Sequence, residues 1–228
     1  FAAGDAMENF LPAITNDAFS FPAPLVDVHG AAGPLSVLEL FHGPTAAFKD
    51  FGARFLAATL ERVPRDDPRR LTILVATSGD TGGAAVEAFR GRERADLFVL
   101  FPHGRVSDVQ RRMMTSANDN NVHALAIEGT FDDCQAMVKG LFNHHAFRDR
   151  VRLSAVNSIN WARIVAQVVY YFTAAATLGA PHRKMSFTVP TGNFGDIFAG
   201  YVAERMGLPI DRLVIATNVN DILARTIS

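Results

Sequence analysis

The sequence predicts an α/β fold built on mostly parallel sheets flanked by helices. From Leu71 onward, short apolar runs alternate with segments of helical periodicity. The apolar runs are rich in β-branched or aromatic residues and carry few charges, as is typical of strands covered on both faces. The expected strands span 71–76, 97–101, 122–127, 152–156, 185–189 and 213–217. Repeated strand–helix alternation implies crossover connections and therefore parallel neighbours.

Helices are expected between these strands, and one more is expected after Lys49. The predicted helical segments are 82–90, 107–116, 131–142, 159–178 and 194–206, and no closing helix is expected after the last strand. The segment 159–178 is the most apolar and should be buried. The stretch 61–70 is charged and contains two prolines, which predicts an exposed connection between the helix after Lys49 and the first strand.

Composition and charge exclude several classes of function. The chain has 228 residues, 49% of them hydrophobic, and a formal net charge of −1. This is enough to build one large core or two modest ones. A charge so close to zero leaves no basic stripe for a nucleic acid. No apolar run reaches the roughly 18 residues needed to span a bilayer, so we expect no membrane partner, and the seven histidines show no spacing typical of metal ligands.

The single cysteine, Cys134, excludes an internal disulfide. It favours a reducing compartment, and we therefore expect a cytoplasmic protein, in agreement with an N-terminus that shows no secretory signal. Cys134 lies in a helical segment, where a buried thiol that packs as a small hydrophobe is one interpretation and a reactive thiol is the other.

Lys49 lies in an unusual segment, Phe-His-Gly-Pro-Thr-Ala-Ala-Phe-Lys-Asp-Phe-Gly at 41–52. Its neighbours Phe48 and Phe51 belong in a core, whereas most surface lysines have polar neighbours. Desolvation favours a neutral amine, which is the form that condenses with a carbonyl compound. The alternative is a lysine that opens a helix and extends its charge into solvent. This segment alone leaves both interpretations open.

Two turns between a strand and a helix could bind anions. The first, 76–83, contains Ser78, Gly79, Asp80 and Thr81. Glycine permits positive φ and close approach of a ligand, and open amides beside hydroxyls suit a carboxylate or a phosphate. The alternative is an ordinary capped turn in which Ser78, Asp80 or Thr81 is the N-cap.

The second turn, 189–196, reads Val-Pro-Thr-Gly-Asn-Phe-Gly-Asp. Its Gly-x-x-Gly frame offers several amides to one anion, but it lacks a Walker lysine and the full dinucleotide-binding spacing. A compact monophosphate therefore suits it better than a nucleotide. We expect Asp196 to be a first-turn acid favoured by the helix dipole, worth roughly 0.3–1 kcal/mol, rather than a phosphate ligand.

Together, a desolvated lysine, a loop for a carboxylate and a loop for a monophosphate match the needs of pyridoxal 5′-phosphate acting on an amino acid. At this point the residues resemble the threonine synthase family, within the fold-type II pyridoxal-phosphate enzymes related to tryptophan synthase β. The matching stretches are 38–52, 77–82, 131–138, 154–163, 189–196 and 216–221. They cover most of the chain in order, and the segment around Lys49 and the segment 192–196 are highly specific.

The resemblance implies roles for particular residues. Lys49 would form the Schiff base with the cofactor and act as the main acid and base. The remaining assignments are Gly192, Asn193, Phe194, Gly195 and Asp196 for the cofactor phosphate, Ser78, Gly79, Asp80 and Thr81 for the substrate carboxylate, and Asn157, Ser158, Asn160 and Arg163 for the substrate side. Many relatives carry asparagine in the place of Asp80, where it contacts the cofactor phenolate. An acid would repel that phenolate, so we do not expect the contact in this chain.

The implied reaction converts O-phospho-L-homoserine and water to L-threonine and phosphate. A phospho-lyase, a serine/threonine dehydratase and a non-catalytic cofactor-binding relative are the alternatives. The resemblance also implies that 1–70 and 158–228 belong to a large cofactor-binding domain and that 71–157 forms a smaller, mobile subdomain. The matching stretches are typical of the central portion of such an enzyme, truncated at both ends. The residue that contacts the pyridine nitrogen in this family is therefore not expected within this chain. The sequence does not specify an oligomeric state.

Overall fold

The computed structural model describes residues 4–29, 33–64, 67–158, 160–192, 194–219 and 221–227. They fall into two units. Unit 1 comprises Phe1–Pro22 and Phe41–Asn157, and unit 2 comprises Ala23–Leu40 and Ser158–Ser228. The sequence also predicted a change of domain after residue 157, but it assigned the whole of 1–70 to the other domain. Which parts of the chain move remains a prediction.

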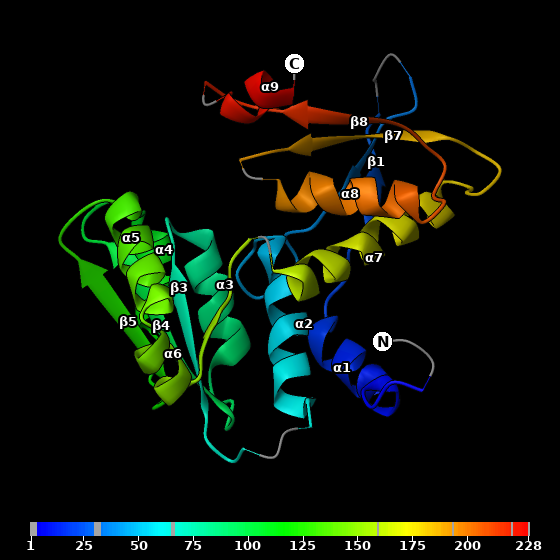
Figure 1. Cartoon of the computed structure of the whole chain (residues 1–228). Coiled ribbons are helices and arrows are strands. Elements are labelled where there is room, and N and C mark those ends of the chain that lie inside the picture. The colour runs from blue at the N-terminus through cyan, green and yellow to red at the C-terminus, as the bar shows by residue number, and fades with distance from the viewer. Residues whose placement is uncertain are drawn as a thin grey trace. The chain divides into compact units, whose positions relative to one another are not determined.

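Unit 1 is built on a four-stranded parallel sheet in the order β5-β4-β3-β6 (Figure 1). Its strands are β3 (Leu71–Ala76), β4 (Ala95–Pro102), β5 (Val122–Ile127) and β6 (Leu153–Ala155). Leu71 pairs with Ala95, and Leu97 pairs with Val122. The predicted parallel sheet is therefore confirmed, and β3 and β5 have the bounds expected from the apolar runs.

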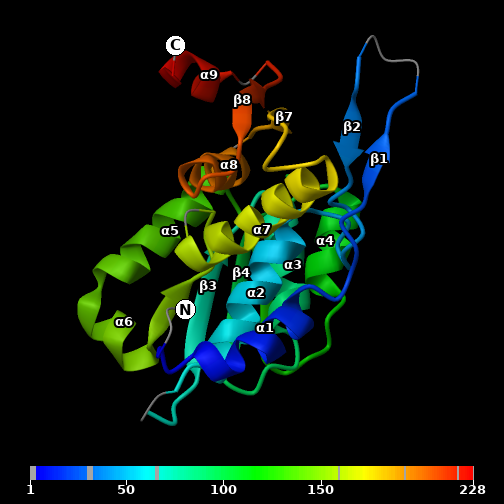
Figure 2. The same cartoon turned by 90° about the vertical axis from the view of Figure 1, so that its right-hand side faces the viewer.

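Helices cover both faces of this sheet (Figure 2). Helices α2 (Lys49–Arg62), α3 (Asp80–Phe89) and α4 (Asp108–Thr115) lie on one side, and α5 (Phe131–Asn143) and α6 (His145–Val151) lie on the other. The short η1 (Glu8–Phe10) leads into α1 (Leu11–Ala18), which packs on α2. The elements η1, α1 and α6 were not predicted. Helix α6 begins directly after His144, whose Nδ1 accepts a hydrogen bond from the Phe147 amide.

Strand alternation divides the core of unit 1 between the two faces. Toward α5, Leu74 and Leu100 pack with Cys134, which is completely buried. Burial raises the pKa of the Cys134 thiol, and the structure therefore supports its interpretation as a small core residue. Toward α3, a Cβ on Gly82 would lie 2.5 Å from the Thr77 methyl carbon and 3.1 Å from a Val99 methyl carbon. This close approach seats the start of α3 directly on the sheet.

Unit 2 contains two small sheets. Strands β1 (Leu25–Asp27) and β2 (Ser36–Leu38) are antiparallel, and β7 (Met185–Pro190) and β8 (Ile210–Ala216) are parallel. Helix α7 (Trp161–Thr177) packs against α8 (Gly195–Arg205), which lies along the β7–β8 sheet (Figure 1). The most apolar predicted helix is thus largely buried as α7, although its Val169 is 45% exposed.

Two expectations about the order of elements were wrong. Strands β1 and β2 precede Leu71, so the strand at Leu71 is not the first in the chain. A short helix, α9 (Ile222–Ile227), follows β8, where no closing helix was expected. Strands of three residues and a helix of six carry too little periodicity for the sequence pattern to predict them. Among the residues that the structure describes, none of the helices combines the length and the apolar character needed to cross a membrane.

A buried carboxylate determines how the chain enters α2. Asp50 is completely buried, and its two oxygens accept hydrogen bonds from Thr45, at 2.8 Å from the backbone amide and 2.6 Å from the hydroxyl. A Cβ on Gly43 would lie 2.4 Å from an Asp50 carboxylate oxygen, and Ala46 adopts a left-handed φ of 53°. The loop is therefore wound tightly around the Asp50 side chain. Helix α2 begins at Lys49, directly after this loop.

We predict that Thr45→Val destabilises the protein that contains this chain by roughly 1.5–3 kcal/mol at neutral pH, because a buried carboxylate loses a hydrogen bond. Burial raises the pKa of the Asp50 carboxyl, and the two Thr45 bonds act in the opposite direction. A carboxyl whose pKa is raised by folding stabilises the folded state most at pH values below its ordinary pKa. This contribution to the free energy of unfolding is lost as the pH rises through the raised pKa. Removing a bond that lowers the pKa therefore costs more as the carboxyl ionises.

Urea unfolding at about pH 5 and about pH 7.5 measures this difference. Thr45→Ser retains the hydroxyl and serves as the matched control, with a small cost at both values. A Thr45→Val deficit that does not grow with pH would show that the Thr45 hydroxyl does not support an ionised Asp50.

Candidate functional site

Lys49 is the first residue of α2, and its side chain is covered rather than extended into solvent. The side chain is 16% exposed, and Nζ lies 4.6 Å from the centroid of the Phe48 ring. Nζ also lies 3.6 Å from Oδ2 of Asp80. The aromatic ring and the carboxylate both favour a positive charge on the amine. Lys49 therefore combines an apolar neighbour with an acid that can hold its proton.

The turn before α3 leaves backbone amides open to an anion. Gly79 is the N-cap of α3, with φ of 149°, which corrects the expectation that Ser78, Asp80 or Thr81 would be the N-cap. The Thr77 hydroxyl accepts hydrogen bonds from the amides of Gly79 and Gly82, at 3.0 and 2.9 Å. The amides of Asp80 and Thr81 have no acceptor among the described residues. Together with the exposed Ser78 hydroxyl, they could bind a carboxylate.

The turn before α8 has similar properties in unit 2. The Thr191 amide donates to the Ala216 carbonyl at 2.8 Å, which ties the end of β7 to the end of β8. Helix α8 then begins at Gly195, and its N-cap Phe194 makes no side-chain capping hydrogen bond. A Cβ on Gly192 would meet no atom within 4 Å, whereas Asn193 lies outside the described residues. Uncapped first-turn amides beside an open glycine fit a phosphate group.

Asp196 lies in the first turn of α8, where the helix dipole favours an acid. Its Oδ1 accepts hydrogen bonds from the Tyr170 hydroxyl at 2.6 Å and from the Tyr171 hydroxyl at 3.1 Å. Burial, together with the charge of Asp196, raises the pKa of both tyrosines, so both remain neutral donors. These bonds attach α8 to α7 next to the phosphate-type turn. Neither tyrosine was predicted from the sequence as a site residue.

The segment around the start of α7 holds the remaining candidates. Asn157 is exposed at the end of unit 1, and Ser158 begins unit 2. Asn160 is the N-cap of α7, and its side-chain oxygen accepts from the Ala162 amide at 3.0 Å. Arg163 is 2% exposed, and its Nε and one terminal nitrogen have no hydrogen-bond partner among the described residues. Burial lowers the pKa of Arg163 to about 10, so it remains charged at neutral pH.

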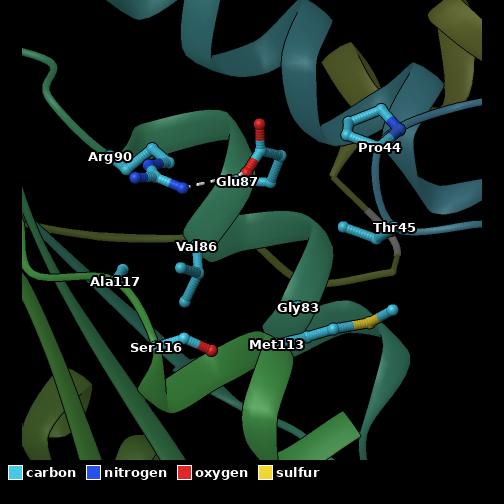
Figure 3. Close-up of a pocket in the computed structure, with 9 residues that line it drawn as sticks. All are labelled: Pro44, Thr45, Gly83, Val86, Glu87, Arg90, Met113, Ser116 and Ala117. Carbon is cyan, nitrogen blue, oxygen red and sulfur yellow. Dashed lines mark ion pairs between the residues drawn. The ribbon is translucent and has the colours of Figure 1, made fainter. Parts of the chain in front are cut away.

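A separate cavity of about 180 Å³ lies along α3 in unit 1 (Figure 3). The residues that line it are Pro44, Thr45, Gly83, Val86, Glu87, Arg90, Met113, Ser116 and Ala117. Glu87 and Arg90 form an ion pair of 3.5 Å at its wall. None of the site residues predicted from the sequence lines this cavity. Thr45, the hydrogen-bond partner of Asp50, is one of the residues that line it.

Gln110 of α4 is a further residue at the predicted site that the sequence analysis missed. Its Nε2 donates a hydrogen bond of 2.7 Å to Oδ1 of Asp80. The signal for this residue was the Ser-x-x-Gln pattern at 107–110, which predicts a capping box. That pattern locates the start of a helix, but it does not reveal which loop the glutamine side chain reaches.

Comparison with known proteins identifies the family of the chain. Residues 19–227 match the family described as "Pyridoxal-phosphate dependent enzyme". The chain is 57% identical over 210 residues to the threonine synthase of Pseudomonas aeruginosa, covering 89% of this chain and 45% of that protein. It is 43% identical over 226 residues to the Escherichia coli threonine synthase, covering 99% of this chain and 51% of that protein.

Among solved structures, the pyridoxal-phosphate-bound threonine synthase of Brucella melitensis superimposes with a TM-score of 0.89 and 59% identity. That match covers 99% of this chain and 49% of the other. An aspartate racemase dependent on the same cofactor shares the fold, with a TM-score of 0.70 at 14% identity. The chain thus spans about half the length of the curated relatives it matches. The fold, the covered lysine and the family match lead to one conclusion: this chain belongs to the family of pyridoxal-phosphate dependent enzymes.

Proposed function

We propose that the protein containing this chain converts O-phospho-L-homoserine and water to L-threonine and phosphate, with pyridoxal 5′-phosphate as its cofactor. The observation that carries the proposal is Lys49, a covered amine between the Phe48 ring and the Asp80 carboxylate. The high identity to threonine synthases supports this reaction over others catalysed on the same fold. We also propose that the protein acts in the cytoplasm on a small-molecule substrate, in line with its single buried cysteine.

The chemistry of the residues assigned from the sequence suits the cofactor. Lys49 would bind its aldehyde through Nζ. The first-turn amides of α8, at Gly195 and Asp196, would bind its phosphate, beside Gly192, Asn193 and Phe194. When bound, the cofactor supplies an electron sink that stabilises negative charge at the substrate Cα.

The side chains of unit 1 would bind the substrate and move its protons. Ser78, Thr81 and the amides that follow Gly79 would bind the substrate carboxylate. Lys49 would remove the Cα proton and return protons at later steps, with the Asp80 carboxylate beside its protonated form. A single amine can serve repeatedly only if it releases and regains a proton near the working pH. The covered side chain and the adjacent acid push its protonation in opposite directions, which suits this task.

Arg163 supports a second anion site, in unit 2. A buried cation without a partner is costly, and such groups are normally paired or bind a ligand. Its free guanidinium nitrogens could bind an anionic group of the substrate. We therefore propose that Arg163 contributes to substrate binding. Asn157, Ser158 and Asn160, which are nearby in sequence, would contribute as well. The side-chain oxygen of Asn160 already accepts from the Ala162 amide of α7.

Product analysis tests the proposed reaction. The protein is incubated with pyridoxal phosphate and O-phosphohomoserine, and phosphate and threonine are both measured. We predict equal amounts of the two, and no turnover from Lys49→Ala, which should also lose the visible absorbance of the covalently bound cofactor. Phosphate with a keto acid in place of threonine would contradict the proposal in favour of a phospho-lyase. Absence of both products from the wild type would contradict it in favour of a non-catalytic relative.

We predict that Arg163→Met raises KM for O-phosphohomoserine by about tenfold or more, because charged hydrogen bonds to the substrate are lost. The free energy of unfolding without ligand should stay the same or rise, because an unpaired buried charge is replaced by an apolar side chain. Steady-state kinetics and urea unfolding measure the two effects. A marked loss of stability with unchanged KM would show that Arg163 is a structural residue.

A further inference from the structure

The first turn of α4 covers the loop that carries Asp80. Gln110 is the N3 residue of α4 and forms a capping box with Ser107. Its Oε1 accepts from the Ser107 amide at 3.2 Å and from the Ser107 hydroxyl at 3.0 Å. The backbone amide of Gln110 donates in return to the Ser107 hydroxyl at 3.2 Å. The capping box thus uses the oxygen of the glutamine side chain and leaves its nitrogen for another partner.

That partner is Asp80, at 2.7 Å from Nε2 of Gln110 to Oδ1. The orientation of a glutamine amide is often ambiguous, because its oxygen and nitrogen look alike. In this case two donors from Ser107 determine which end is the oxygen, so the nitrogen must face the carboxylate. The Gln110 side chain also lies against the loop backbone, since a Cβ on Gly79 would come within 2.3–2.5 Å of its amide atoms.

The other carboxylate oxygen of Asp80 forms an ion pair with Lys49. Oδ2 lies 3.6 Å from Nζ, whereas Oδ1 is held by Gln110. The Asp80 side chain is 49% exposed, so without a donor it could turn into solvent. Two other acids of these segments have partners of their own: Asp50, next to Lys49 in sequence, accepts from Thr45, and Asp108, in the first turn of α4, lies 3.4 Å from Arg111. The contacts therefore run in a line from Ser107 through Gln110 and Asp80 to Lys49.

We propose that Gln110 is a positioning residue for the reaction: it holds the Asp80 carboxylate toward Lys49, so that this amine keeps its proton partner between proton transfers. The inference rests on the proposed role of Lys49 as the acid and base. It assigns a function to α4, which the cofactor and substrate assignments leave without one. The competing interpretation is that Gln110 only caps α4 and joins it to α3.

The test measures how the reactivity of the Lys49 amine depends on pH in the cofactor-free protein. Competitive acetylation over a range of pH, followed by peptide mapping, gives the pH midpoint at which Lys49 becomes reactive. We expect Gln110→Met to lower this midpoint by about half a pH unit, because an ammonium that loses its acid partner releases its proton more readily. The exposed Lys139, on α5 of the same unit, is the internal reference and should not change.

Two controls separate positioning from capping. Thr130→Ala removes the capping box at the start of α5, where the Thr130 hydroxyl accepts from the Asp133 amide. It should lower Tm about as much as Gln110→Met without moving the Lys49 midpoint. Asp80→Asn should lower the midpoint, and the double variant Asp80→Asn with Gln110→Met should show no additional shift, since residues that act through one another are not additive.

Gln110→Ala is the second variant if Gln110→Met folds poorly. An unchanged Lys49 midpoint in a folded Gln110 variant, or a shift that adds to that of Asp80→Asn, would overturn the inference. Failure of the proposed function would look different. Absence of threonine formation by the loaded wild type would refute the reaction, while the cofactor-free midpoint would still report whether Gln110 acts on Lys49 through Asp80.

Discussion

The buried Asp50 carboxylate is the interaction on which the position of Lys49 depends. Its two hydrogen bonds from Thr45 close the loop before α2, and the loop leaves no space for a side chain at Gly43. The left-handed backbone at Ala46 is tolerated because the surrounding contacts determine the path of the chain. Lys49 and Asp50 are consecutive, so a carboxylate held inside the unit holds the adjacent lysine at the start of the helix. The amine that we propose binds the cofactor is thereby placed by a buried neighbour that is bound to Thr45.

The same local device recurs in both units. A parallel strand ends, a glycine-containing turn follows, and a helix begins whose N-cap residue makes no side-chain capping hydrogen bond. Such turns lie at the carboxyl ends of strands, which is where α/β proteins bind ligands. Unit 1 adds the amine of Lys49 and the acid of Asp80. Unit 2 adds Asp196, which is held by two tyrosines, and Arg163, whose Nε and one terminal nitrogen have no hydrogen-bond partner in the described part of the chain. We propose that covalent chemistry and proton transfer belong to the first unit and much of the anion binding to the second.

The sequence predicted those parts of the structure that depend on local pattern. Strands β3 and β5 and the helix that begins at Lys49 follow from apolar runs and from one unusual segment. The contacts of Gln110 with Asp80 and of the two tyrosines with Asp196 could not be predicted, because they join residues 30 and 25–26 positions apart through side-chain geometry. Gly79 adopts the positive φ expected of a ligand-binding glycine, whereas Gly195 begins a helix. Two similar glycine motifs thus differ in backbone conformation. The difference depends on tertiary packing, which the local sequence does not reveal.

The most direct test of the account is to find which lysine binds the cofactor aldehyde. Lys49, Lys139 and Lys184 are the lysines of the chain, and the last two are exposed whereas Lys49 is largely covered. The protein is loaded with pyridoxal phosphate, reduced with borohydride, digested and mapped by mass spectrometry. The account predicts a pyridoxyl group on Lys49, close to one per chain, with only traces on the exposed lysines. Stoichiometric label on Lys139 or Lys184, with Lys49 unmodified, would contradict it.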